Sequence, residues 1–259
     1  MLINSENHTC NPRNNMPGTI YFSSTYSNED HVIDCSKVHL DYKDSDVSTF
    51  LLMDLFRHRS TNLLTGLRKF NLNKDSRIFI YVTSHGGDHF IKIRDRMVVL
   101  SDELNRTLFE MHLKQKYKEI VFFLDTCEAF TLFDSVTAPN IFFFGSSILD
   151  EKAKSFHYND FLRAGTSDRG TYRLKKEIEE YDKLPNTNNV LVSDLMDNIL
   201  KQQTFLDSTP KIRNDVKRPQ KYQEFFGNKD AGVTFKNHIL PLSILEQSQG
   251  NHFYKYKIV

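Results

Sequence analysis

The sequence predicts an α/β fold, an open and mostly parallel sheet with helices on both faces. Two observations predict it: three short apolar runs of strand length, and amphipathic patterns of helical period between and after them. Runs that are apolar on both sides are typical of buried, parallel strands. Strands that alternate with helices favour an open α/β sheet, in which the chemistry lies just beyond the carboxyl ends of the strands.

The three predicted strands are rich in β-branched and aromatic residues, which favour extended structure. They are Arg77 to Ser84, Glu119 to Asp125 and Asn140 to Ser147. Each is short enough for a strand and too short for a buried helix. We therefore expect them to form the centre of the sheet.

Three segments show apolar residues at helical spacing. Their apolar positions are Val47, Phe50, Leu51 and Leu55 in the first, Leu104, Leu108 and Met111 in the second, and Val192, Leu195, Met196, Ile199 and Leu200 in the third. Ser101 is the predicted N-cap of the second helix, and Ala129 to Val136 is predicted to begin another helix.

The composition excludes several classes of protein. The chain has 259 residues and a net charge of +1. It therefore lacks the excess of basic residues that is typical of a nucleic-acid-binding protein. Three cysteines are too few for a disulfide scaffold, and the longest apolar runs are far short of the roughly 20 residues of a membrane helix.

We predict one domain over residues 1–259. Residues 207–226, which contain two prolines and many charges, are predicted to form a long loop.

Two of the predicted strands end in reactive side chains. The first leads into His85 and two glycines, and the second leads from Asp125 into Cys127. The carboxyl ends of parallel strands share one sheet edge, so we expect His85 and Cys127 to be neighbours. An imidazole lowers the pKa of a neighbouring thiol, which favours the nucleophilic thiolate. The backbone of Gly86 can approach a substrate carbonyl and stabilise an oxyanion. The pattern predicts acyl transfer through Cys127.

These motifs resemble those of the caspase-like cysteine peptidases of the legumain branch, and within them the family of GPI-anchor transamidase catalytic subunits. The resemblance extends from about Leu2 to Gly227. The segments that carry it are Cys10-Asn11-Pro12-Arg13-Asn14, Asp41-Tyr42, the His85 and Cys127 motifs, Ser146-Ser147, Asp168-Arg169, Thr171-Tyr172, Ser208-Thr209-Pro210 and Phe225-Phe226-Gly227.

The resemblance implies a function and a site. Such a subunit cleaves a C-terminal signal from a precursor protein and transfers the new carboxyl end to the amine of a GPI glycolipid. Cys127 would be the nucleophile and His85 the general base, while Asp125 and Ser146 would line the pocket for the residue that receives the anchor. Cys10 would form a disulfide with another transamidase subunit of a membrane complex on the lumenal face of the endoplasmic reticulum. Cys35 has no motif around it, and we interpret it as a residue that packs in the protein interior.

The chain departs from the family pattern in two places. The resemblance implies a further, central strand before the Cys10 stretch, so we expect that Met1 is not the true start or that the chain is a fragment. Family members also have an acidic residue where His39 stands, in a calcium site, and we therefore predict no calcium. We expect no cofactor, because no Cys or His pair has zinc-ligand spacing and no Gly-rich turn has nucleotide-binding spacing.

Two alternatives stay open. One is a caspase-like cysteine endopeptidase of the legumain or metacaspase type, in which water takes the acyl group. The other is a catalytically dead, caspase-like scaffold, which the intact His85 and Cys127 disfavour.

Overall fold

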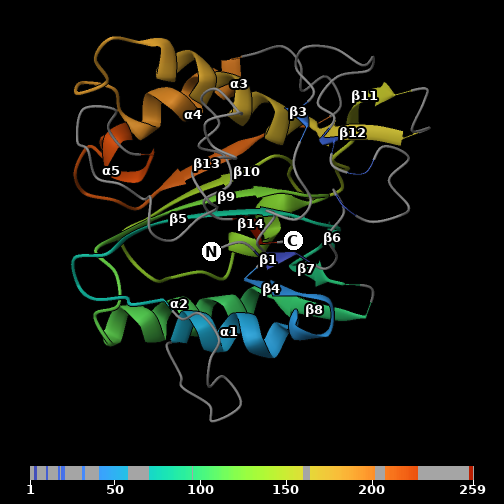
Figure 1. Cartoon of the computed structure of the whole chain (residues 1–259). Coiled ribbons are helices and arrows are strands. Elements are labelled where there is room, and N and C mark those ends of the chain that lie inside the picture. Colours follow the sequence, from blue (N-terminus) through green and yellow to red (C-terminus); the bar gives the residue numbers. More distant parts are fainter. Residues whose placement is uncertain are drawn as a thin grey trace.

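A seven-stranded sheet forms the centre of the computed structural model, which describes residues 3–4, 10, 17, 19–20, 31–32, 41–57, 70–94, 96–159, 164–201, 208–226 and 257–258. In spatial order its strands are β13 (Lys211–Asn214), β10 (Ile141–Gly145), β9 (Glu119–Asp125), β5 (Arg77–Thr83), β14 (Lys257–Ile258), β1 (Ile3–Asn4) and β4 (Tyr42–Lys43). Figure 1 shows the sheet between two layers of helices.

The three strands predicted from the sequence lie side by side and run parallel. β5 and β9 pair along their whole length, from Arg77 opposite Glu119 to Thr83 opposite Asp125, and β10 pairs in parallel with β9. Every residue of β9 and β10 is buried. The prediction of buried, parallel central strands is confirmed.

Helices cover both faces of the sheet (Figure 1). Helices α1 (Thr49–Arg57) and α2 (Ser101–Leu113) lie on one face, and α3 (Arg169–Lys183) and α4 (Val192–Lys201) lie on the other. Because alternate strand residues point to opposite faces, Phe122 joins one hydrophobic cluster and Phe123 the other. The two-faced α/β architecture is therefore confirmed.

Two local predictions about these helices are wrong. Phe50 is 65% exposed, so it does not share the buried face of α1. Leu100, and not Ser101, occupies the N-cap of α2. The Ser101 hydroxyl donates to the Leu132 carbonyl at 2.8 Å instead, because a buried hydroxyl needs a partner there.

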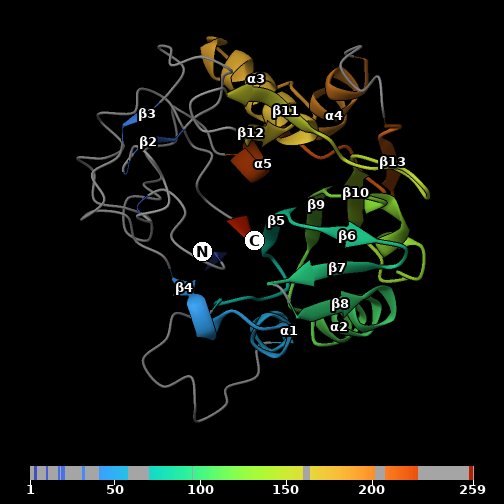
Figure 2. The same ribbon diagram turned by 90° about the vertical axis from the view of Figure 1, so that its right-hand side faces the viewer.

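Small elements gather beside the central sheet. β6 (Gly86–Gly87), β7 (Phe90–Ile93) and β8 (Met97–Leu100) form an antiparallel sheet that follows directly from β5 (Figure 2). Two hairpins pair β11 (Ser155–Asn159) with β12 (Ala164–Asp168), and β2 (Thr19–Ile20) with β3 (His31–Val32). A short 3-10 helix, η2 (Asp44–Asp46), follows β4.

The segment after β9 forms a 3-10 helix, η4 (Ala129–Phe133), rather than the predicted longer helix. The prediction of a long loop over 207–226 is also wrong, because this segment contains β13 and the helix α5 (Tyr222–Phe226). β13 pairs antiparallel with β10. Arg218 binds the buried Glu119 with an Nη2–Oε2 distance of 2.5 Å, so part of the charged stretch is held by the sheet.

The middle of the sheet also contains β14, between β5 and β1. Its two residues pair in parallel with Tyr81 and Val82 of β5. They occupy part of the central region in which the resemblance implies a further strand. The expectation that the chain lacks that strand stays a prediction.

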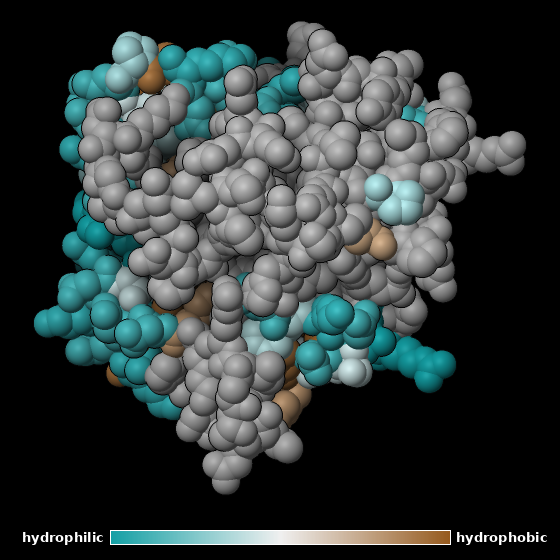
Figure 3. Space-filling model, viewed as in Figure 1, coloured by the Kyte–Doolittle hydropathy of each residue, from teal (hydrophilic) through white to brown (hydrophobic). Residues whose placement is uncertain are grey.

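The coloured part of the surface in Figure 3 is mostly hydrophilic, with small hydrophobic patches. Within the described ranges, no helix has the length and apolar content needed to cross a membrane. In the same ranges, no group of three or more His, Cys, Asp or Glu side chains is arranged to hold a metal ion.

Candidate active site

His85 and Cys127 lie beyond the paired ends of β5 and β9. The last pair of the register is Thr83 opposite Asp125, so each reactive residue follows its strand by two positions. The backbone of Gly86 packs directly on the Cys127 turn: a Cβ built on Gly86 would lie 2.7 Å from the Cys127 carbonyl oxygen. Only glycine permits this approach. The structure thus brings the two predicted residues to one place.

The thiol of Cys127 is free and half-buried. Its Sγ donates to the Ala153 carbonyl oxygen at 3.9 Å, and among the described residues no hydrogen bond joins it to the exposed His85. In the absence of substrate, catalytic hydrogen bonds are often long or poorly aligned. The imidazole of His85 is therefore accessible to solvent and to a substrate.

The turn after Cys127 is sharp and firmly held. Glu128 adopts the left-handed conformation, with φ of 49°, which costs free energy for a residue with a side chain. The Glu128 N–H donates to the Glu151 carbonyl at 2.9 Å. The Glu151 carboxylate in turn accepts the N–H and hydroxyl of Thr209 at 2.6 and 2.7 Å. These contacts fix the loop that carries Ala153 beside the thiol.

Ser147 supports the same turn from β10. Its buried hydroxyl donates to the Thr126 carbonyl at 2.8 Å and accepts the Ala129 N–H at 3.0 Å, so it holds the backbone on both sides of Cys127. The sequence alone assigns Ser147 no role in the site. The pair of serines at the end of a predicted strand was the available signal.

Asp125 lies beneath the site and is only 1% exposed. Its Oδ2 accepts the N–H of Thr171 at 2.5 Å and the Thr171 hydroxyl at 2.8 Å. Asp125 therefore caps the N-terminus of α3 from a neighbouring strand. Asp168, the N-cap residue itself, instead accepts the Thr83 hydroxyl at 2.8 Å.

This carboxyl group is electrostatically unusual. Burial, together with the negative charge of Asp168, raises the pKa of Asp125 to about 6, although hydrogen bonds from Ser146 and Thr171 oppose the shift. Burial also raises the pKa of Tyr81, whose hydroxyl lies 2.6 Å from the Thr171 hydroxyl. The strand ends thus cover a buried polar network that can hold a proton near neutral pH.

Asp125 and Ser146 are 1% and 2% exposed, so neither side chain forms an open wall in this structure. A Cβ on Gly170 would lie 2.9 Å from the Asp125 carboxyl carbon, which shows how closely α3 covers it. Their predicted role in a substrate pocket stays a prediction.

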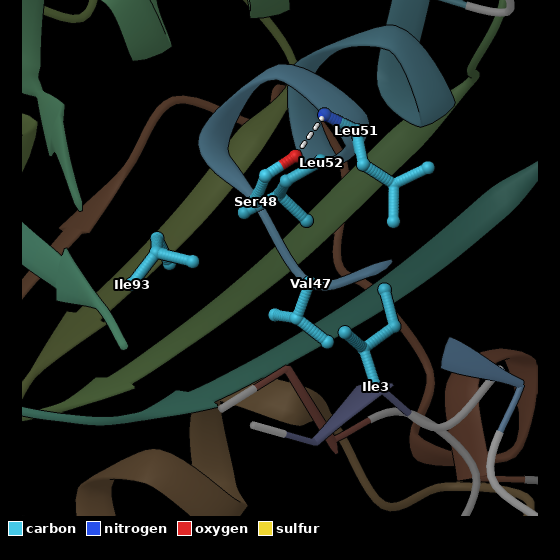
Figure 4. Close-up of a pocket in the computed structure, with 6 residues that line it drawn as sticks. All are labelled: Ile3, Val47, Ser48, Leu51, Leu52 and Ile93. Carbon is cyan, nitrogen blue, oxygen red and sulfur yellow. Dashed lines mark hydrogen bonds between the residues drawn. The ribbon is translucent and has the colours of Figure 1, made fainter. Parts of the chain in front are cut away.

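A shallow depression elsewhere does not fit this chemistry. Figure 4 shows that it lies beside α1, and its lining residues are Ile3, Val47, Ser48, Leu51, Leu52 and Ile93. The Ser48 hydroxyl accepts the Leu51 N–H at 3.1 Å and so serves as a helix cap. The remaining lining is apolar and offers no acid, base or nucleophile.

Cys10 is disulfide-bonded in the structure, in contrast to Cys127. A bond from Cys10 to another subunit would therefore require thiol–disulfide exchange. The predictions for Cys35 and His39 fall outside the described residues.

Comparison with known proteins agrees with the geometry. The chain is 30% identical over 263 residues to a protein of Saccharomyces cerevisiae named "GPI-anchor transamidase", and the alignment covers 99% of this chain and 60% of that protein. A protein of the same name from Schizosaccharomyces pombe is 28% identical over 234 residues, covering 88% of this chain and 59% of the relative. The human protein of that name is 27% identical over 216 residues, covering 83% and 53%.

The chain thus spans between about half and three fifths of the length of these curated relatives. A family profile described as the peptidase C13 family matches residues 1–228, which include β5, β9 and both reactive residues. With most of its length matched in this way, the chain belongs to the peptidase C13 family.

Proposed function

We propose that this chain is the catalytic subunit of a GPI-anchor transamidase and works by acyl transfer through Cys127. The observation that carries the proposal is the free thiol of Cys127 at the same sheet edge as His85, with Gly86 packed on its turn. The name shared by the relatives supplies the reaction.

In the first step the Cys127 thiolate attacks the carbonyl carbon of a peptide bond near the C-terminus of a precursor protein. His85 accepts the thiol proton as general base and then gives it to the departing amine. The carbon–nitrogen bond breaks and an acyl-thioester forms on Cys127. The backbone N–H of Gly86 stabilises the oxyanion of the intermediate.

In the second step the amine of a GPI glycolipid attacks the thioester carbonyl. His85 takes the proton from the attacking amine, the carbon–sulfur bond breaks, and an amide forms. The thiolate is restored, so the two steps involve no net oxidation or reduction and require no cofactor.

Asp125 and Ser146 would select the residue at the new carboxyl end. Both are buried and lie close to the backbone of the Cys127 turn, so a large substrate side chain would not fit against them. Other transamidase subunits, bound on the lumenal side of the endoplasmic reticulum membrane, would present the precursor and the glycolipid.

The main alternative is a cysteine endopeptidase, in which water replaces the amine. The carboxyl group of Asp125, two residues before Cys127, is the observation that favours it, because an acidic group close to the nucleophile would pair with the guanidinium of an arginine substrate.

The acceptor and the cleaved residue distinguish the two functions. The purified full chain is incubated with two peptides that differ only in having serine or arginine at the cleaved position, with hydrazine as the amine. We expect cleavage after serine and a peptide hydrazide that exceeds the free acid, with neither product from Cys127→Ala.

Cleavage after arginine that yields only the free acid would instead identify an endopeptidase. Failure of both peptides to react or to acylate Cys127 would identify a catalytically dead scaffold.

A further inference from the structure

The loop after His85 and the turn after Cys127 are joined by one buried side chain, that of Thr131. Thr131 lies in η4, four residues after Cys127, and is 3% exposed. Its hydroxyl accepts the backbone N–H of His89, which lies four residues after His85, at 2.9 Å. The contact therefore links equivalent positions on the two chain segments that carry the reactive residues.

The same hydroxyl also holds the turn of the nucleophile. It donates to the Glu128 carbonyl at 2.7 Å, while the Gly87 carbonyl lies farther away, at 3.4 Å. A hydroxyl has a single proton to donate and two lone pairs to accept with. The Thr131 hydroxyl donates its proton to the nearer Glu128 carbonyl and accepts the His89 N–H with a lone pair, so it can make both hydrogen bonds at the same time.

The backbone at both ends of this link needs support. His89 has φ of 62° and Glu128 has φ of 49°, and both are left-handed residues that carry side chains. Such conformations persist only where their surroundings hold them. Thr131 bonds the N–H of His89 and the carbonyl of Glu128, and the Ser101 N–H bonds the carbonyl of His89 at 2.9 Å.

A second contact joins the same elements at the surface. The His89 ring hydrogen-bonds the Asp88 carboxylate on one side, and its Nε2 lies 3.8 Å from Oδ2 of Asp134, the residue that follows η4. These groups are about half exposed, so solvent weakens their interaction. The buried hydroxyl of Thr131 therefore carries the link.

From these contacts we infer that Thr131 is a positioning residue, which sets the placement of His85 relative to Cys127 through the backbone of His89 and Glu128. The inference rests on the proposed function, because it assigns Thr131 a task in bringing the base to the nucleophile. Thr131 itself does not touch the reacting atoms.

Three variants of the full chain test this role. Thr131→Val keeps the shape and removes the hydroxyl, and Thr131→Ser keeps the hydroxyl. Thr107→Val is the matched control, because Thr107 is fully buried and, within the part of the chain that the structure describes, its hydroxyl hydrogen-bonds only Met53 Sδ of α1, at 3.2 Å. The readouts are the pH midpoint of Cys127 alkylation and the kcat for peptide cleavage.

We expect Thr131→Val to move the alkylation midpoint upward, toward that of His85→Ala, and to lower kcat by about 10- to 100-fold, as expected for misplaced catalytic groups. Thr131→Ser should stay within about threefold of the wild type, and Thr107→Val should keep the wild-type midpoint. An unchanged midpoint and kcat in Thr131→Val would overturn the inference, as would equal losses in the serine variant.

One measurement needs no variant. In the wild type the His89 amide should exchange its hydrogen slowly, because Thr131 accepts it in a buried position. Exchange as fast as that of an exposed amide would show that the link does not persist in solution. If the wild type neither cleaves peptide nor shows an alkylation midpoint that depends on His85, the proposed function fails. If the wild type is active and Thr131→Val leaves its midpoint and kcat unchanged, only the positioning role of Thr131 is refuted.

Discussion

His85→Ala is expected to slow the alkylation of Cys127 at neutral pH, because the variant lacks the imidazole that takes the thiol proton. The expected effect on turnover is larger, since the variant has also lost the group that protonates the departing amine. The measurement is the rate of iodoacetamide modification at Cys127 from pH 5 to pH 10, read by peptide mass spectrometry so that only this residue is counted.

His112→Ala is the matched control for this experiment. His112 lies in the last turn of α2 and contacts Tyr117, with ring centroids 6.1 Å apart. We expect its variant to keep the wild-type alkylation profile. Equal profiles for His85→Ala and the wild type would show that the two residues do not form a catalytic pair.

Asp125→Asn is expected to stabilise the folded chain at neutral pH while reducing its activity. An asparagine oxygen can still accept the N–H and hydroxyl of Thr171, and its amide can donate toward Asp168. The substitution also removes a carboxyl group that is costly to ionise in this buried position.

The pH dependence of this gain follows from the raised pKa of Asp125. In the unfolded chain the group ionises near the ordinary value of 3.8, whereas in the folded chain it keeps its proton until about pH 6. The wild type therefore loses stability as pH rises from about 4 to about 6, and the loss persists above pH 6. A shift of about two pH units corresponds to about 3 kcal/mol, which is the upper end of the expected gain at pH 7.

Urea denaturation at pH 4 and pH 7 measures this difference. Asp197→Asn, on the exposed face of α4, serves as the control and should change stability little at either pH. A loss of stability in Asp125→Asn that is equal at both pH values would contradict the electrostatic explanation and indicate that only the hydrogen bonds matter.

The placement of His85 and Cys127 at one edge of the sheet could be predicted from the sequence, because it depends on a general property of parallel sheets. Apolar runs identified β5 and β9, and parallel pairing then places whatever follows them at one edge. His85 and Cys127 needed no knowledge of side-chain contacts. Helices α2 and α4 could be predicted for a different reason, because their buried apolar residues recur at helical spacing.

The supporting residues could not be predicted in this way. Thr131 and Ser147 act through hydrogen bonds to backbone groups of segments distant in the sequence, and a threonine or serine in a list of residues carries no sign of its partner. β13 escaped prediction for a related reason. Its residues lack an apolar pattern, and its extended form depends on pairing with the edge of β10.

The most direct test of the central claim is to trap the acyl-enzyme. The full chain is mixed with the serine-containing peptide, quenched in acid within one turnover, and digested for mass spectrometry. We predict that the N-terminal part of the peptide is attached as a thioester to Cys127, and that hydrazine added before the quench removes it as the hydrazide. Cleaved peptide with no adduct on Cys127, or equal cleavage by Cys127→Ala, would contradict acyl transfer through this residue.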